Sequence, residues 1–118
     1  MKKDFGISHL FKSTLNSFSG LKIAFYGEQA FRHECFVLLI LSAILFFTDK
    51  KPQEWIIVIG LWLFVMSIEL LNSAIEKTCD LVTKDFNILI KSAKDMASAA
   101  IFIVIIINIL AWISVFFM

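Results

Sequence analysis

The chain ends in the run MASAAIFIVIIINILAWISVFFM, residues 96–118. Asn108 is the one polar interruption of its apolar centre. A helix needs roughly 20 apolar residues to cross the hydrocarbon core of a bilayer, and this run is long enough by itself. It therefore predicts a transmembrane helix in which Asn108 forms a hydrogen bond to a neighbouring helix.

Two shorter apolar stretches precede this run. The first extends from Cys35 to Thr48, with Ala30 and Phe31 adding to its length, and the second extends from Trp55 to Glu69. Both are short for a complete span, so their helices should continue beyond the hydrocarbon at one end. We therefore expect an all-α membrane protein whose three span-containing helices cover about residues 29–48, 54–82 and 91–117.

The composition supports one membrane-embedded domain over residues 1–118. The 118 residues are 59% hydrophobic and 18% charged, which leaves too little polar surface for a soluble domain. The net charge of +1 argues against nucleic-acid binding, because phosphates need a basic excess. Cys35 and Cys79 are too few for a disulfide framework, and we expect them to be small buried side chains.

The N-terminal segment, about residues 6–26, has an amphipathic pattern in place of a continuous apolar run. Apolar side chains recur there at helical spacing and fall within one stripe of about 140°. This pattern predicts an amphipathic helix lying on the membrane surface, with packing against another protein element as the alternative. The stripe consists of Ile7, Leu10, Phe11, Leu15, Phe18, Leu21 and Phe25.

Basic residues predict the orientation of the spans. They precede the first span as Lys2, Lys3, Lys12, Lys22 and Arg32, and they lie between the second and third spans as Lys77, Lys84, Lys91 and Lys94. Cytoplasmic loops carry an excess of Lys and Arg. The N-terminus should therefore be cytoplasmic, and the turn at residues 49–54 and the C-terminus should lie on the other side of the membrane.

The segment Glu69-Leu-Leu-Asn72-Ser-Ala-Ile-Glu76-Lys-Thr-Cys-Asp80 continues directly from the second span. On a helix, Asn72, Glu76 and Asp80 lie at about −60°, −20° and +20° from Glu69, so all four project from one face. Carboxylates at the edge of a bilayer are costly and usually mark function. The alternative is that they pair with Lys or Arg and only hold helices together.

Two further polar clusters are expected at the same membrane boundary. Glu28-Gln-Ala-Phe-Arg32-His-Glu34 precedes the first span, and Lys94-Asp95-Met-Ala-Ser98 begins the third. Carboxylates bind Mg²⁺ together with phosphate oxygens, and Lys offsets phosphate charge. These parts suit phosphoryl transfer between a soluble and a membrane substrate, although the sequence has neither a P-loop nor a protein-kinase motif set.

These motifs resemble those of the prokaryotic diacylglycerol kinases. The match includes Glu69-Leu-Leu-Asn72-Ser-Ala-Ile-Glu76 with Asp80, Lys94-Asp95-Met-x-Ser98, and Glu28-x-Ala30-Phe31-Arg32-x-Glu34. It covers nearly the whole chain with the spacings intact. The resemblance implies a homotrimer in the bacterial inner membrane that phosphorylates the hydroxyl of diacylglycerol to phosphatidic acid, with ATP and Mg²⁺.

The resemblance also implies roles for individual residues. Glu69 would be the general base, Asn72 would orient it or a phosphate oxygen, and Glu28 and Glu76 would hold Mg²⁺. Contacts with ATP are implied for Glu28, Glu76, Asp85, Phe86, Asn87, Lys94 and Asp95. Contacts with the lipid substrate are implied for Ala30, Phe31, Arg32, Glu34, Glu69, Ser98 and Trp112.

Two alternatives remain at this point. An undecaprenol kinase of the same family would share the Glu69 and Glu76 signature, although the Met96-x-Ser98 pattern is closer to the glycerolipid branch. A non-enzymatic membrane scaffold or a transporter subunit would consume no ATP, and it offers no reason for acidic residues on all three helix ends.

Overall fold

The structure, a computed structural model, describes residues 6–118. These residues form the helices α1 (Ile7–Gly27), α2 (Gln29–Phe47), α3 (Pro52–Val82) and α4 (Ile88–Phe117). By length and composition α2, α3 and α4 are able to cross a membrane. The expected class, an all-α protein with three span-containing helices and an additional N-terminal helix, is confirmed.

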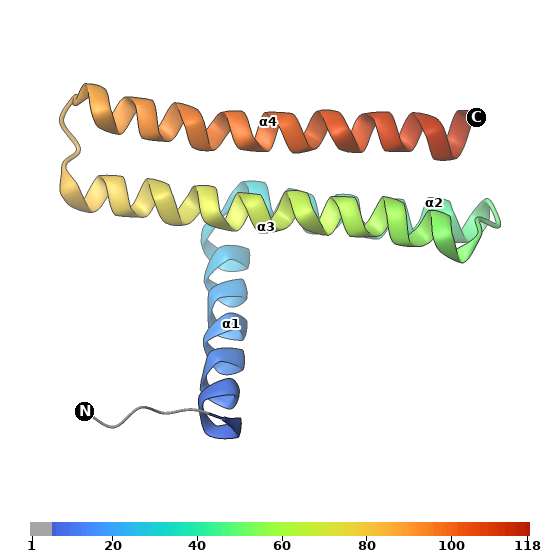
Figure 1. The fold of residues 1–118 in the computed structure, drawn as a ribbon, viewed down its shortest axis with the longest axis horizontal. Coiled ribbons are helices and arrows are strands. Elements are labelled where there is room, and N and C mark those ends of the chain that lie inside the picture. The colour runs from blue at the N-terminus through green and yellow to red at the C-terminus, as the bar shows by residue number, and fades with distance from the viewer. Residues whose placement is uncertain (1–5) are drawn as a thin grey trace.

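The three long helices lie alongside one another (Figure 1). α3 is central, because it contacts both α2 and α4. We call the end that holds the α2–α3 turn and the C-terminus the turn end. The polar end is the opposite part, where α1 joins α2 and where α3 and α4 approach their connection. α1 leaves this layer and runs across the direction of the other helices (Figure 1).

Local sequence explains where the helices begin. Pro52 occupies the first turn of α3, where its missing N–H costs nothing, and the Glu54 carboxylate accepts a hydrogen bond from the Lys51 N–H at 3.1 Å. Asn87 caps α4, because its side-chain oxygen accepts hydrogen bonds from the N–H groups of Leu89 and Ile90 at 2.9 and 3.3 Å. These caps position the turn end and the start of α4.

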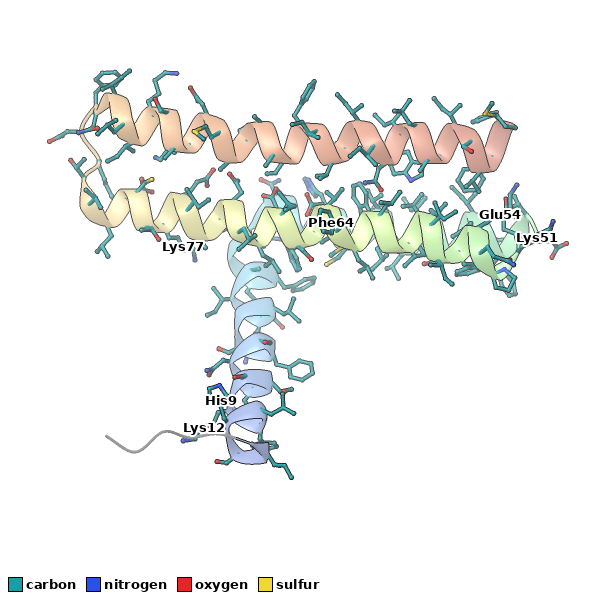
Figure 2. All side chains as sticks on the ribbon, viewed as in Figure 1. His9, Lys12, Lys51, Glu54, Phe64 and Lys77 are labelled. Carbon is teal, nitrogen blue, oxygen red and sulfur yellow. The ribbon has the colours of Figure 1, made fainter. Side chains whose placement is uncertain are left out.

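The core lies along α3. Leu45, Val58 and Val65 are completely buried between the long helices. Large apolar side chains such as Phe46, Phe64 and Phe102 are exposed on the outer faces. Helices surrounded by lipid have this distribution, because lipid solvates apolar side chains. Figure 2 shows Phe64 on α3, well away from Lys51 and Glu54 at the turn end.

Asn108 forms the hydrogen bond between helices that the sequence predicts. Its side chain is fully buried, and Nδ2 donates to the carbonyl of Leu61 on α3 at 3.1 Å and to the carbonyl of Val104 at 2.8 Å. The bond pins α4 to α3 in the middle of the apolar region.

α1 has little protein contact along most of its length. Members of the predicted apolar stripe, such as Ile7, Leu10 and Phe18, are exposed, and Ala24 is the buried residue of this helix. Figure 2 shows His9 and Lys12 near the free end of α1. An exposed apolar stripe on a helix that runs across the spans suits the expected position on a membrane surface. Lys2 and Lys3, which also support the predicted orientation, lie outside the described residues.

Candidate active site

Glu69 lies in the part of α3 that the other helices cover, and it is 8% exposed. Its carboxyl group is within electrostatic range of those of Glu28 and Glu76. The Glu34 carboxyl group, on α2, interacts with it as well. The fold therefore gathers carboxylates from α3, from α2 and from the junction between α1 and α2, as the sequence leads us to expect for one polar site.

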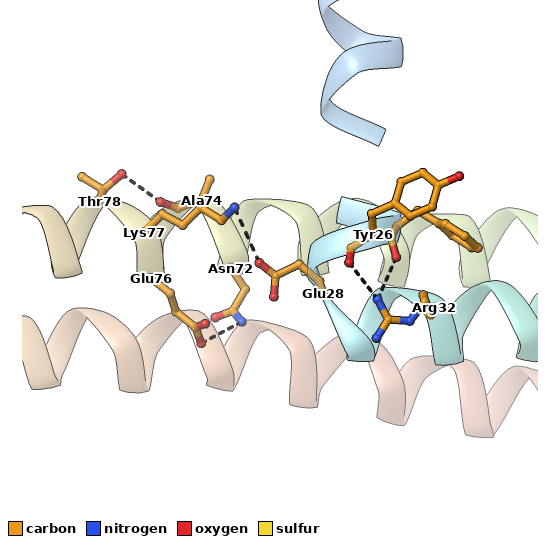
Figure 3. A network of polar contacts seen from close by, with 9 residues as sticks. Tyr26, Glu28, Arg32, Asn72, Ala74, Glu76, Lys77 and Thr78 are labelled. Atoms are coloured by element: carbon orange, nitrogen blue, oxygen red, sulfur yellow. Dashed lines mark hydrogen bonds and ion pairs between the residues drawn. The ribbon is translucent and has the colours of Figure 1, made fainter. Parts of the chain in front are cut away.

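Asn72 and Glu76 form a hydrogen-bonded pair on α3. The Asn72 side-chain amide donates to the Glu76 carboxylate at 3.3 Å (Figure 3). The other amide atom, Oδ1, is buried and has no hydrogen-bond partner among the described residues. Glu76 is exposed. The pair fixes the Glu76 carboxylate on the side of α3 from which Glu69 also projects.

Glu28 lies at the junction of α1 and α2, outside both helices. Its backbone is extended, with φ −119° and ψ 112°, and its N–H donates to the Ala24 carbonyl at 2.8 Å. Its carboxylate lies 3.8 Å from the ammonium group of Lys77 on α3 (Figure 3). Because α1 turns away at this point, the Glu28 side chain is brought beside α3.

Arg32 stabilises this junction. Its guanidinium donates to the carbonyls of Phe25 and Tyr26 at 2.9 and 3.2 Å (Figure 3). These carbonyls belong to the last turn of α1, where helix carbonyls lack a partner within the helix. Of its neighbours in the sequence, Ala30 is exposed and Phe31 is buried in the core. In this structure Arg32 therefore stabilises the junction between α1 and α2.

α4 contributes two ion pairs at the polar end. Lys94 lies 3.1 Å from Asp80 on α3, and its ammonium group also interacts with Glu76. Lys91 pairs with Asp95 one turn later, at 2.6 Å. The ion pair between Lys94 and Asp80 joins α4 to α3, so for Asp80 the structure agrees with the alternative in which an acidic residue holds helices together. Glu69 and Glu76 form no such ion pair within residues 6–118.

Several predicted residues do not join this cluster. Trp112 lies about 27 Å along α4 from Lys94, at 1.5 Å per residue, and its ring centroid is 5.8 Å from that of Trp62. In the α3–α4 connection, the Asn87 side chain caps α4, the Phe86 ring is exposed, and the Asp85 N–H donates to the Thr83 hydroxyl at 3.1 Å. Ser98 is exposed on α4.

A groove of about 460 Å³ lies between α1 and α3 beside this cluster. Its lining is mainly apolar and includes Leu21 and Leu70, and its polar members are Ser17, Glu28, Ser73 and Lys77. Sequence reasoning gave no role to Ser73, and Lys77 contributed only to the predicted orientation of the spans. Lys77 lies about 80° from Glu69 around the helix and so outside the predicted row. Only the packing of the α1–α2 junction against α3 brings it to Glu28.

The donor set suits a hard divalent cation in combination with phosphate. No three carboxylate, histidine or cysteine groups between residues 6 and 118 are close enough together to hold a metal ion. Mg²⁺ is usually bound by one or two carboxylates plus substrate phosphates. Glu28 fits such a ligand because its carboxylate already faces a cation, the Lys77 ammonium. Glu76, exposed and fixed by Asn72, fits a second ligand.

The fold and the site define a membrane protein with a carboxylate-rich polar end beside an apolar groove. The family model for prokaryotic diacylglycerol kinase matches residues 15–116. The chain is 44% identical over 112 residues to the diacylglycerol kinase of Haemophilus influenzae, covering 95% of each chain. It is 36% identical over 107 residues to that of Pseudomonas aeruginosa, covering 91% of this chain and 87% of the relative. The Escherichia coli K12 enzyme is 35% identical over 107 residues, with coverages of 91% and 88%.

The chain therefore belongs to the prokaryotic diacylglycerol kinase family. It is a lipid kinase of this family and a bacterial membrane protein. The scaffold and transporter alternatives are set aside, because these relatives are diacylglycerol kinases and the similarity covers almost their whole length.

Proposed function

We propose that this chain transfers the γ-phosphoryl group of ATP to the hydroxyl of diacylglycerol, forming phosphatidic acid and ADP. The observation that carries the proposal is that the Glu69 carboxyl group interacts with those of Glu28 and Glu76, and that Glu28 also lines an apolar groove. A lipid-facing groove next to phosphate-binding groups gives a lipid hydroxyl and a water-soluble nucleotide a common meeting point. The names of the family and of its relatives supply diacylglycerol as the substrate class.

Glu69 is the proposed general base. As the lipid hydroxyl oxygen attacks the γ-phosphorus, its proton passes to the Glu69 carboxylate, and the bond from the phosphorus to the ADP oxygen breaks. The shielding of Glu69, at 8% exposure, supports this assignment, because a base kept from bulk water accepts a proton from the lipid rather than from water. Asn72 lies between Glu69 and Glu76 in the sequence and fixes the latter.

Glu28 and Glu76 are the proposed ligands of Mg²⁺. The ion would neutralise charge on the β- and γ-phosphate oxygens. Lys94 and Asp95 are proposed to contact ATP, together with the connection Asp85, Phe86 and Asn87. The position of Lys94 supports a contact with ATP, because its ammonium group interacts with both Asp80 and the proposed metal ligand Glu76.

The lipid is proposed to enter sideways from the membrane along the groove between α1 and α3. Phe31, Arg32 and Glu34 lie in the first turns of α2, which follows the groove residue Glu28. They are proposed to contact the lipid headgroup region, as are Ala30 and Ser98. Trp112 lies about 27 Å along α4 from Lys94 and packs on Trp62 in the apolar part of the helices, so its proposed contact is with an acyl chain and not with the hydroxyl.

The proposed setting is the bacterial inner membrane, with the polar end in the cytoplasm, where ATP is found. Positive charges near this end support that orientation. We further propose that residues 1–118 act as one kinase domain within a homotrimer. The exposed apolar residues on α1 and on the outer faces of the long helices give lipid and neighbouring copies a surface to cover.

The test is a phosphate-transfer assay on the full chain in phospholipid vesicles. The vesicles carry diacylglycerol, undecaprenol or neither, and ATP labelled at the γ-phosphate is added with Mg²⁺. Label should appear in phosphatidic acid. Label confined to undecaprenyl phosphate would identify the other branch of the family, and no labelled lipid in any vesicle would contradict the proposal.

A further inference from the structure

Lys77 is a cation next to the proposed metal ligands that the reaction scheme above does not use. Its ammonium group lies 3.8 Å from the Glu28 carboxylate and is largely exposed, with the two side chains 59% and 28% exposed (Figure 3). It directly follows Glu76 on α3, and it lines the groove between α1 and α3. It is therefore the ion-pair partner of one proposed Mg²⁺ ligand, Glu28, and the next residue in the chain after the other, Glu76.

The nearby positive charges differ in how firmly they are held. Lys94 lies 3.1 Å from Asp80, and Lys91 lies 2.6 Å from Asp95. Arg32 is committed to carbonyls at the end of α1. Among the ion pairs described at this end, the contact of Lys77 is the longest, and an exposed pair at this distance contributes little. Lys77 is therefore the cation that is easiest to redirect toward a ligand.

The site is rich in negative charge, and a mobile cation would offset the charge of an incoming triphosphate. Glu69 interacts with both Glu28 and Glu76, and these three carboxylates repel a triphosphate that approaches them. A divalent ion bound to Glu28 would compete with the Lys77 ammonium for the same carboxylate. Lysine is a flexible point charge with rotatable donors, and it binds phosphate well.

We propose that Lys77 is a phosphate-contacting residue of the nucleotide site, held by Glu28 until nucleotide and metal bind. In the nucleotide complex its ammonium group contacts an oxygen of the triphosphate in place of the Glu28 carboxylate. This inference rests on the proposed function, because it takes Glu28 as a metal ligand and ATP as the phosphoryl donor. It assigns to this chain a nucleotide-binding residue outside the row of Glu69, Asn72, Glu76 and Asp80.

The test compares the full chain with Lys77→Gln, Lys77→Arg and Lys51→Gln in lipid nanodiscs. Lys51 is the matched control, because it is a lysine at the other end of α3, about 39 Å away at 1.5 Å per residue. The primary readout is the Kd of a non-hydrolysable ATP analogue at saturating Mg²⁺. In Lys77→Gln this Kd should rise about tenfold, the effect of one charge-assisted hydrogen bond. Lys77→Arg and Lys51→Gln should stay within about twofold of the parent.

Steady-state kinetics give the second readout. The KM for ATP should rise in Lys77→Gln, whereas kcat and the KM for diacylglycerol stay close to those of the parent. An unchanged nucleotide Kd in Lys77→Gln overturns the proposal, and so does a rise in the lipid KM alone, which would indicate a headgroup contact. If the parent protein itself binds no nucleotide with Mg²⁺, the proposed function fails, and that result is distinct from a failure of Lys77.

Discussion

Trp62 joins α3 to the start of α2 by donating a hydrogen bond from its indole Nε1 to the main-chain carbonyl of Glu34, 2.9 Å away. The indole is buried, and its ring packs on that of Trp112. This bond holds the turn of α2 that carries the Glu34 side chain against the helix that carries Glu69. The position of one carboxylate relative to the other therefore depends on a tryptophan about two turns along α3 from Glu69.

Trp62→Phe should lower the free energy of unfolding by about 1–3 kcal/mol, because it removes a buried hydrogen bond and leaves space in the core. Reversible unfolding in mixed detergent micelles measures this change. Trp55→Phe is the matched control, since the Trp55 indole donates no hydrogen bond within the described part of the chain. Equal losses in the two variants would show that the bond to Glu34 is irrelevant to stability.

Lys50 closes the turn end. Its ammonium group donates to the Val115 carbonyl at 2.9 Å and lies 5.5 Å from the centroid of the Phe116 ring. Lys50→Met should therefore lower the free energy of unfolding by about 1 kcal/mol. Turnover per folded molecule should not change, because the proposed chemistry takes place at the other end of the helices. A stable variant with strongly reduced turnover would contradict this separation of roles.

The helices were predictable because each leaves a local signal in the sequence. The run at residues 96–118 is apolar over the length of a span, and the stripe containing Leu10, Phe11 and Phe18 repeats at helical spacing. The hydrogen bond of Asn108 was predictable as well, because a lone amide in hydrocarbon needs a partner. Such signals depend on neighbours along the chain and not on the final packing.

The contacts of the site were less predictable. Helical geometry places Glu69, Asn72 and Glu76 on one face of α3, but it does not reveal that Asp80 is bound to Lys94 on α4. The pairing of Glu28 with Lys77 depends on the angle at the junction between α1 and α2, and no local sequence pattern determines that angle. Trp112 has a suitable residue type for lipid contact, but it lies far along α4 from Lys94, beside Trp62.

Glu76→Gln should raise the Mg²⁺ concentration needed for half-maximal activity by at least about tenfold, since it removes one of two proposed anionic ligands. The measurement is an Mg²⁺ titration of phosphate transfer at fixed ATP. Glu54→Gln, the same change at the turn end, serves as the control. An unaltered Mg²⁺ dependence in Glu76→Gln would exclude Glu76 as a metal ligand.

Asn72→Leu tests whether Asn72 acts through Glu76. Losing the amide that fixes this carboxylate should reduce apparent Mg²⁺ affinity or activity by about 10–100-fold, the usual cost of removing a group that orients a metal ligand. The double variant with Glu76→Gln should then be no worse than Glu76→Gln alone, because the two residues act as one unit. Additive losses would give Asn72 an independent role, such as a contact with Glu69 or with phosphate.

The most direct test of the account is single-turnover phosphate transfer by Glu69→Gln, with Mg²⁺–nucleotide binding measured on the same sample. Removing a general base should slow transfer to diacylglycerol by about 10²–10⁴-fold. The variant should remain folded and bind nucleotide as the parent does, because Glu28 and Glu76 are intact. Transfer at nearly the parent rate would contradict the assignment of Glu69 as the base and, with it, the proposed arrangement of the site.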